Sequence, residues 1–321
     1  MSGSVHLLAL PTPFQIGAVN CYALEGEPLT LIDVGPHTDE ALKTLTSQLE
    51  RLGHRLQDVE QLLITHPHLD HFGLAAAVKE ASGCEVVAHP QAGVKLANFR
   101  GYYEREQGYF TDILVSMGMP LQSARLITQL PQSFSVLAPH VQADRCLSEG
   151  DTVRAGDLTL QVLETPGHSM ASLCFYVADQ EILFAGDHLI DGITPNPLLE
   201  MPEAPGEERP RTLAQYLDSL NKVAKLKLQV VYSGHRSVIH DPQRVIELTL
   251  KHHHHRSAKV FKLITEKPLT PYELMGKLFP NLPATEQFLG MSEAIGHLEW
   301  LQDQGSVRAL DQGGVVYFEV V

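Results

Sequence analysis

Residues 65–71, with the sequence THPHLDH, constrain this 321-residue chain more than any other stretch. They hold three histidines and one carboxylate, namely His66, His68, Asp70 and His71. The apolar run 62–64 comes directly before them and is typical of the end of a buried strand. Pro67 prevents the segment from continuing as a central strand or a regular helix. The sequence therefore predicts a loop at a strand end. Because imidazoles and carboxylates bind zinc and similar divalent ions, it also predicts a metal site there.

Three later strand ends have the same character, a ligand-type residue placed directly after a glycine. The three residues are His168, Asp187 and His235. Glycine lets the backbone turn tightly and approach an ion closely. Because strand ends meet at one edge of an open α/β sheet, we expect these residues and the 65–71 loop to form one site.

The order of predicted elements indicates a layered α/β domain over residues 1–241. Strands are predicted at 5–10, 20–24, 29–33, 59–65, 83–89, 157–163, 171–177, 181–185 and 229–233, and helices at 38–52, 73–81 and 212–226. Residues 92–137 are a largely helical insertion rich in Tyr, Phe and Met. Such side chains suit either a cap over the metal groove or additional core. A Pro-rich, acidic connector follows at 193–210.

From residue 242 to 321 the pattern changes to helix, helix, helix and hairpin, the order of a winged helix. The helices are predicted at 244–265, 270–278 and 288–304, and the hairpin at 306–321. The third helix contains Glu293, Glu299 and Asp303 but no Lys or Arg, which suits phosphate binding poorly. We therefore expect this segment to pack against the catalytic domain or a second subunit, as in a homodimer. The four histidines at 252–255 indicate a solvated helix face or adventitious metal binding.

The net charge of −14 is unevenly distributed along the chain. Residues 242–321 hold 8 basic and 9 acidic residues, which leaves 16 basic and 29 acidic residues in the rest. A negative field repels polyanions, so a nucleic-acid partner is disfavoured and a small-molecule substrate is favoured.

We see neither a basic signal-peptide segment nor an apolar run of about 18 residues. The four separated cysteines suit reduced thiols. We therefore expect a cytoplasmic protein without a membrane partner.

The order and spacing of the ligand-type residues resemble the metallo-β-lactamase superfamily over about residues 5–240. Family members carry a His-x-His-x-Asp-His loop, then a lone His, a bridging Asp and a final His. The resemblance implies a four-layer αββα sandwich with two divalent metal ions. It assigns His66, His68 and His168 to one ion. It assigns Asp70, His71 and His235 to the other, with Asp187 bridging both. Asp33 matches the aspartate that braces the histidine loop.

A two-metal site of this kind implies hydrolysis. Two ions about 3.5–4 Å apart lower the pKa of a shared water toward ~7, which gives a hydroxide that attacks a carbonyl carbon or a phosphorus. We expect zinc, although iron and manganese also suit these ligands. Asp70 is expected to relay a proton to the leaving group.

Two branches of the family imply different substrates. The sequence GDHL at 186–189, followed by residues 193–196, is similar to glyoxalase II-like hydrolases and implies an ester, thioester or lactone. The C-terminal segment resembles that of lactamase-β-like-2 endoribonucleases, which implies single-stranded RNA or a small phosphodiester. We favour the first because of the charge distribution. Arg236 is expected to clamp a substrate carboxylate or phosphate, or to form an ordinary salt bridge. His188 is a further candidate for substrate binding.

Overall fold

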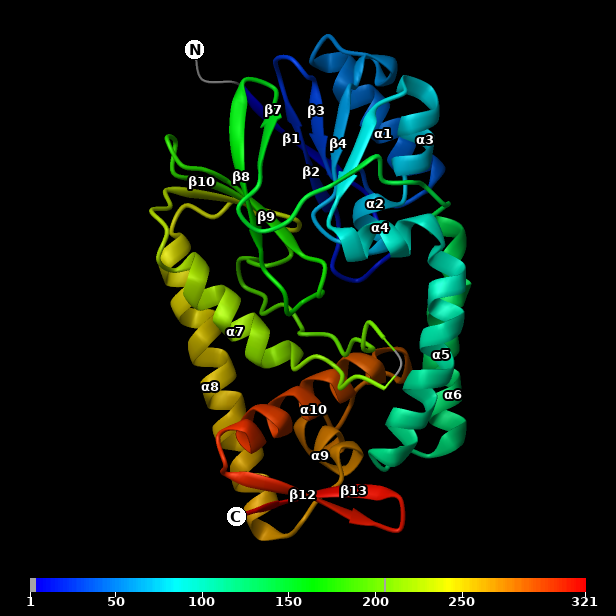
Figure 1. Ribbon diagram of the computed structural model, residues 1–321, viewed down its shortest axis with the longest axis vertical. Helices are drawn as coiled ribbons and strands as arrows, with labels where there is room; N and C mark the ends of the chain where they lie inside the picture. The colour runs from blue at the N-terminus through cyan, green and yellow to red at the C-terminus, as the bar shows by residue number, and fades with distance from the viewer. Residues whose placement is uncertain (1–3, 205) are drawn as a thin grey trace.

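Two β-sheets packed face to face form the larger part of the computed structural model, which describes residues 4–204 and 206–321 (Figure 1). The first sheet has the order β1–β2–β3–β4–β5–β6. Its strands are β1 (Val5–Leu10), β2 (Val19–Leu24), β3 (Thr30–Ile32), β4 (Gln61–Leu63), β5 (Glu85–Ala88) and β6 (Arg145–Cys146). The second has the order β11–β10–β9–β8–β7. Its strands are β7 (Thr152–Ala155), β8 (Leu158–Glu164), β9 (Leu173–Val177), β10 (Ile182–Gly186) and β11 (Val230–Ser233).

Helices cover the outer face of each sheet, so the layers run helix, sheet, sheet, helix. Buried residues of both sheets meet between them, among them Leu63, Phe175 and Phe184. The first sheet packs its other face on α1 (Asp39–Arg51) and α3 (Ala75–Ser82), and the second packs on α7 (Thr212–Val223). The predicted αββα sandwich is therefore confirmed.

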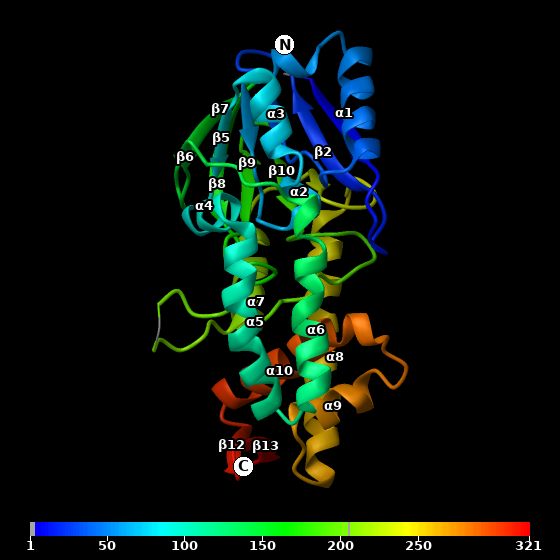
Figure 2. The same ribbon diagram turned by 90° about the vertical axis from the view of Figure 1, so that its right-hand side faces the viewer.

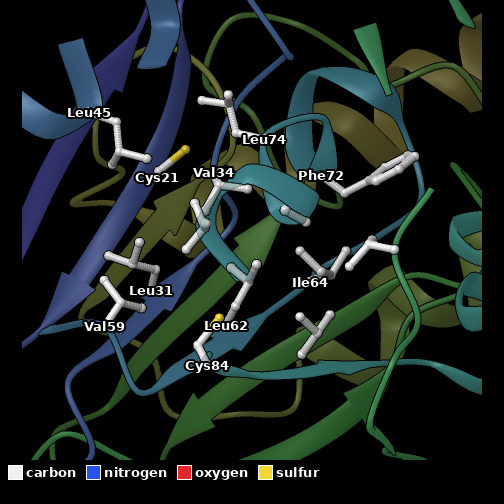
Figure 3. Packing of buried hydrophobic residues seen from close by; sticks show 14 of the residues in the cluster. Cys21, Leu31, Val34, Leu45, Val59, Leu62, Ile64, Phe72, Leu74 and Cys84 are labelled. Atoms are coloured by element: carbon white, nitrogen blue, oxygen red, sulfur yellow. The ribbon is translucent and has the colours of Figure 1, made fainter. Parts of the chain in front are cut away.

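The core under α1 shows why this segment forms a helix. Ala41, Leu45 and Leu49 recur every four residues and are fully buried, as a helical apolar stripe requires. Thr38 caps the helix by accepting a hydrogen bond from the Ala41 amide at 3.1 Å. Figure 3 shows Leu45 beside Cys21 of β2, in the same cluster as Leu31, whose strand neighbour in register is Leu62. This packing fixes β3, which is followed by Asp33, and β4, which leads into the histidine motif.

The histidine motif is only partly a loop. The structure places a short helix, α2 (Leu69–Phe72), within the second half of the motif. The prediction of a loop throughout was therefore wrong for residues 69–71. Pro67 restricts the backbone only as far as His68, which is extended and directly precedes the helix. The acidic residue in the first turn, Asp70, then favours the start of a helix. Asp70 and His71 consequently project from a turn of helix.

The helical insertion links the two ends of the molecule. It comprises α4 (Pro90–Ala97), α5 (Phe99–Ser116), α6 (Leu121–Ser133) and the short turn η2 (Ser135–Leu137). Phe99 at the start of α5 lies in the core of the first sheet, next to Phe72. Phe110 and Leu114, further along α5, lie in a core shared with the C-terminal elements. Figures 1 and 2 show α5 and α6 side by side along this flank. The aromatic residues of the insertion thus serve largely as core.

The C-terminal elements follow the predicted order. They are α8 (Pro242–Glu266), α9 (Pro271–Leu278), η3 (Ala284–Glu286), α10 (Gln287–Asp303), β12 (Val307–Gln312) and β13 (Val315–Val320). The helix α8 packs Val245 and Ile246 on the second sheet's core and Val260 and Ile264 in the C-terminal core. Packing therefore continues across residue 242, and the winged-helix assignment stays a prediction. None of the helices in the described part of the chain has the length and hydropathy needed to cross a bilayer.

Candidate metal centre

The predicted ligands gather at one edge of the sandwich because the strands that carry them end there. Strands β3 and β4 are parallel, and so are β10 and β11. Strand β8 runs in the same direction as β10, because both are antiparallel to β9. The segments after β4, β8, β10 and β11 carry the histidine loop, His168, Asp187 and His235. This is the edge at which open α/β sheets build their sites.

Three overlapping groups of three side chains form at this edge, each with ligand atoms within 4.8 Å of one another, and the third joins His66 and His71 to Asp187. The first contains His66, His68 and His168, and the second contains Asp70, His71 and His235. Within the first group, His68 Nδ1 lies 3.0 Å from His66 Nε2 and 3.1 Å from His168 Nε2. Within the second, His235 Nε2 lies 3.4 Å from Asp70 Oδ2. These are the two sets that the resemblance implies.

Asp187 lies between the two groups. Its Oδ1 is 3.4 Å from His71 Nε2 of the second group. Its Oδ2 is 3.6 Å from His168 Nε2 of the first group and 3.5 Å from His235 Nε2 of the second. A carboxylate so placed can reach an ion in either group.

Four of the histidines are oriented by a hydrogen bond on the ring nitrogen that faces away from the group, and for His66 this is the contact of Nδ1 with the Thr65 hydroxyl at 3.0 Å. His71 Nδ1 bonds Asp33 Oδ2 at 2.8 Å, His168 Nδ1 bonds the Asn196 carbonyl at 2.9 Å, and His235 Nδ1 bonds the Ala18 carbonyl at 2.8 Å. A ring that donates from one nitrogen presents a lone pair on the other, which is the usual arrangement of a metal-binding histidine.

Asp33 ties this arrangement to the backbone. It follows β3 with a φ of 56°, in the left-handed region. Its Oδ1 accepts from the Thr65 amide at 2.9 Å, and its Oδ2 accepts from the Thr65 hydroxyl at 2.7 Å as well as bonding His71. The buried carboxylate of Asp33 thus fixes Thr65 and His71, the two ends of the histidine motif, relative to each other.

The donor set suits divalent metal ions in its protonation as well as its geometry. Burial, together with the neighbouring imidazoles, lowers the pKa of His68 to about 3 and that of His66 well below its usual value. Both rings are therefore neutral ligands at pH 7. Burial lowers the pKa of His71, but the carboxylates of Asp187, Asp33 and Asp70 outweigh it and hold this pKa well above normal. Binding an ion must displace that proton.

Two buried atoms in this centre, His71 Nε2 and Asp187 Oδ1, face each other at 3.4 Å but make no hydrogen bond among the described residues. A buried polar atom without a partner costs roughly 1–3 kcal/mol. An ion bound between these two groups would use both atoms.

Gly234 allows this close approach. A methyl group on its Cα would collide with Asp187 Oδ1 and lie 2.7 Å from Cε1 of His71. Gly234→Ala is therefore expected to displace both side chains and lower kcat/KM roughly 10²-fold, since a shift of about 1 Å in a catalytic centre has that effect. The metal content of the purified variant should fall as well.

Gly276→Ala is the matched control, because a methyl group there meets open space in helix α9. Equal activity and metal content in the two variants would contradict the role given to Gly234.

The two predicted substrate contacts differ in exposure. Arg236 is exposed, with a φ of 62°, and a methyl group at Gly192 of the connector would lie 3.1 Å from its Nη1. No carboxylate among the described residues pairs with it, so the ordinary salt bridge is not found.

His188 is only 2% exposed and packs its ring edge-on against Tyr216. The substrate contact of His188 therefore stays a prediction.

A buried ionic network adjoins His168. The Lys95 ammonium lies 2.7 Å from Glu200 Oε2, and Glu200 Oε1 accepts from the Ser169 hydroxyl and the Met170 amide, both at 3.0 Å. Glu106 of α5 is buried beside this pair, and burial raises its pKa to about 7 despite the nearby lysine.

The raised pKa of Glu106 predicts a pH-dependent stability. The folded protein holds the Glu106 proton more tightly than the unfolded chain does, so this stabilisation is complete below about pH 4.5 and is lost as the pH rises through 7. Glu106→Gln removes this pH-dependent loss of stability. At pH 8 we expect the free energy of unfolding of the variant to exceed that of the parent protein by at most about 3 kcal/mol. Urea unfolding at pH 5 and pH 8 measures the difference. Glu104→Gln, on the exposed side of the same helix, should leave the profile unchanged.

Several supporting residues were not predicted from the sequence. Thr65 bonds both Asp33 and His66, and its place at the start of the motif was the only signal. The carbonyls of Ala18 and Asn196 orient two histidines through the backbone, so no side-chain pattern could have indicated them.

Comparisons with known proteins agree with this architecture. The Metallo-beta-lactamase superfamily domain matches residues 15–235. The chain is 30% identical over 317 residues to the probable metallo-hydrolase YqjP of Bacillus subtilis (strain 168), covering 99% of this chain and 98% of that protein. It is 32% identical over 145 residues to a hydroxyacylglutathione hydrolase of Rhodopseudomonas palustris (strain ATCC BAA-98 / CGA009), covering 45% of this chain and 38% of that protein.

A solved structure gives the same result over the whole chain. The metallo-beta-lactamase family protein TTHA1429 from Thermus thermophilus superposes with a TM-score of 0.81 at 27% identity, covering 99% of this chain and 98% of that one. The sandwich, the clustered His and Asp side chains and these matches together show that the chain belongs to the metallo-beta-lactamase superfamily and is a metallo-hydrolase.

Proposed function

We propose that this protein is a two-metal hydrolase that cleaves a small ester, thioester or lactone. The observation that carries the proposal is the position of Asp187 between two adjoining groups of ligand-type side chains, one member of each of which, His66 and His71, lies beside it. When bound there, divalent ions, zinc by preference, would supply Lewis acidity and an activated water. His66, His68 and His168 would hold one ion, and Asp70, His71 and His235 the other.

Asp70 is the residue we assign to proton transfer. Burial opposes ionisation, but the neighbouring His71 and His235 hold the pKa of Asp70 below its usual value. The carboxylate is therefore ionised at neutral pH and can accept a proton before passing it to the leaving group. Asp70→Asn is expected to lower kcat roughly 10²-fold. Turnover equal to that of the parent protein in a variant with full metal content would contradict the assignment.

Three features support a small acyl substrate over RNA. The acidic excess lies in the region that carries the site. Helix α10, which would be the recognition helix of a winged helix, is largely buried and has no Lys or Arg. Some relatives are named hydroxyacylglutathione hydrolase, and an acyl group on the glutathione thiol is a thioester. Arg236, which is exposed and has no acidic partner in the described part of the chain, is suited to a carboxylate on such a substrate.

A hydrolysis screen tests the proposal. Acyl-thioesters, lactones, bis-p-nitrophenyl phosphate and short single-stranded RNA are offered to the metal-loaded protein and to the same protein stripped by a chelator. We expect metal-dependent turnover of a thioester, ester or lactone. Turnover of RNA alone would favour a nuclease instead.

A further inference from the structure

A second kind of buried cluster lies in the C-terminal part of the molecule, between helices α8 and α10. It consists of His253, Glu293 and His297, whose ligand atoms lie within 4.8 Å of one another. The two histidines are 0% exposed and Glu293 is 7% exposed. None of these three residues belongs to the groups of ligand-type side chains around Asp187.

The spacing of the three side chains suits a single ion. His297 Nε2 lies 3.4 Å from His253 Nδ1 and 3.4 Å from Glu293 Oε1. Ligands about 2.0–2.1 Å from a tetrahedral zinc ion lie about 3.3 Å apart. The other nitrogen of His297, Nδ1, bonds the Ser257 hydroxyl at 2.7 Å. That contact fixes the ring with Nε2 directed at the other two side chains, as a supporting hydrogen bond does for a metal-binding histidine.

The protonation states also suit a metal ion. Burial lowers the pKa of His253 to about 3. Burial raises the pKa of Glu293, but the hydrogen bond and charge of His297, with His253 and Arg256, lower it further, to about 2. At neutral pH the cluster therefore offers a neutral imidazole and a carboxylate, the forms that bind metal.

Hydrogen bonding within the protein leaves this cluster incompletely satisfied. His253 Nε2 has no partner among the described residues. Two more nitrogen groups face the carboxylate: Arg256 Nε lies 3.7 Å and His252 Nε2 4.0 Å from Glu293 Oε1.

An ion could reach the cluster from solvent. Glu293 lines a pocket of about 340 Å³ together with Arg256 and His252, and Gly192, Thr194 and Asn196 also line it. The carboxylate is therefore the side of the cluster that an entering ion meets first.

We propose that His253, Glu293 and His297 form an additional mononuclear site for Zn²⁺ or a similar divalent ion, which fastens α8 to α10. Two imidazoles and one carboxylate are a characteristic zinc donor set. The ion would be structural, because it cross-links two helices of the C-terminal core and raises the stability of the folded chain by mass action.

The test uses a full-length background variant, His66→Gln with Asp187→Asn, in which the proposed two-metal centre is disabled. Zinc is measured by elemental analysis after dialysis against a weak chelator. We expect about one zinc per chain to remain in this background and to be lost when His297→Gln is added. We also expect zinc to raise the Tm of the background variant and to leave that of the triple variant unchanged.

His254→Gln with His255→Gln is the matched control, because these neighbours in the histidine run are exposed. It should keep the zinc. Loss of zinc in this control, or equal zinc content with and without His297→Gln, would overturn the proposal. A Co²⁺ titration of the background variant decides the case even if His297→Gln does not fold: the absorption of a tetrahedral Co²⁺ site supports the proposal, and its absence overturns it. Because the two-metal centre is disabled throughout, these outcomes are independent of the proposed hydrolase activity.

Discussion

Replacing Asp187 by asparagine is expected to lower kcat/KM roughly 10³-fold, on whichever ester, thioester or lactone the protein turns over. One carboxylate oxygen of Asp187 faces His71, and the other faces His168 and His235. The negative charge of Asp187 therefore lies close to ligands of both groups. A loss of about 4 kcal/mol of transition-state stabilisation corresponds to this factor, and metal centres contribute several kcal/mol. Steady-state kinetics and elemental analysis on the same preparation measure the two effects together.

The neighbouring Asp191→Asn serves as the control, because Asp191 is exposed and lies outside the two groups. It should keep activity and metal content. An Asp187→Asn protein with the metal content and kcat/KM of the parent would remove the basis for a bridged two-metal centre.

Asp33→Ala is expected to cost about 3–5 kcal/mol of folding free energy, the range for removing one partner of a buried ionic contact. The substitution strips the Thr65 amide, the Thr65 hydroxyl and His71 Nδ1 of their acceptor. It also places alanine at a φ of 56°, which asparagine and aspartate tolerate better than other side chains. Chemical denaturation in the presence of a chelator measures the loss without a contribution from bound metal.

Asp33→Asn separates folding from metal binding. Asparagine keeps the backbone conformation and one acceptor but removes the charge beside His71. We expect a folded protein that binds metal 10- to 100-fold more weakly, the usual effect of altering a residue that orients a ligand. If Asp33→Asn and the parent protein bound zinc equally well, Asp33 would only stabilise the fold.

The sequence allowed a layered α/β domain to be predicted because its signals are local, whereas the αββα arrangement was implied by the resemblance to the metallo-β-lactamase superfamily. Apolar stripes such as Ala41, Leu45 and Leu49 mark the helices. Ligand residues beside glycines mark the strand ends, and parallel strands bring those ends to one edge. The placement of His66, His68, Asp187 and the other ligand-type residues in one cluster follows from these two facts.

What the sequence did not predict depends on contacts between distant segments. Phe110 of the insertion and Phe288 near the C-terminus pack at 5.2 Å between ring centroids, and no pattern in either segment indicates the other. Four consecutive histidines likewise look equivalent in sequence. Helical geometry turns His253 toward α10 and leaves His254 and His255 in solvent, so one member of the run joins Glu293 and His297.

The burial of His188 has the same origin. Its place next to Asp187 made it a candidate for the site, and its packing against Tyr216 of α7, a residue distant in sequence, could not be predicted.

Anomalous diffraction from crystals of the active, metal-loaded protein tests the central claim most directly. Data collected on either side of the metal's absorption edge should show two peaks about 3.5–4 Å apart. One is expected among His66, His68 and His168, and the other among Asp70, His71 and His235, with Asp187 between them. Crystals of active protein with no anomalous peak among these side chains would contradict the account.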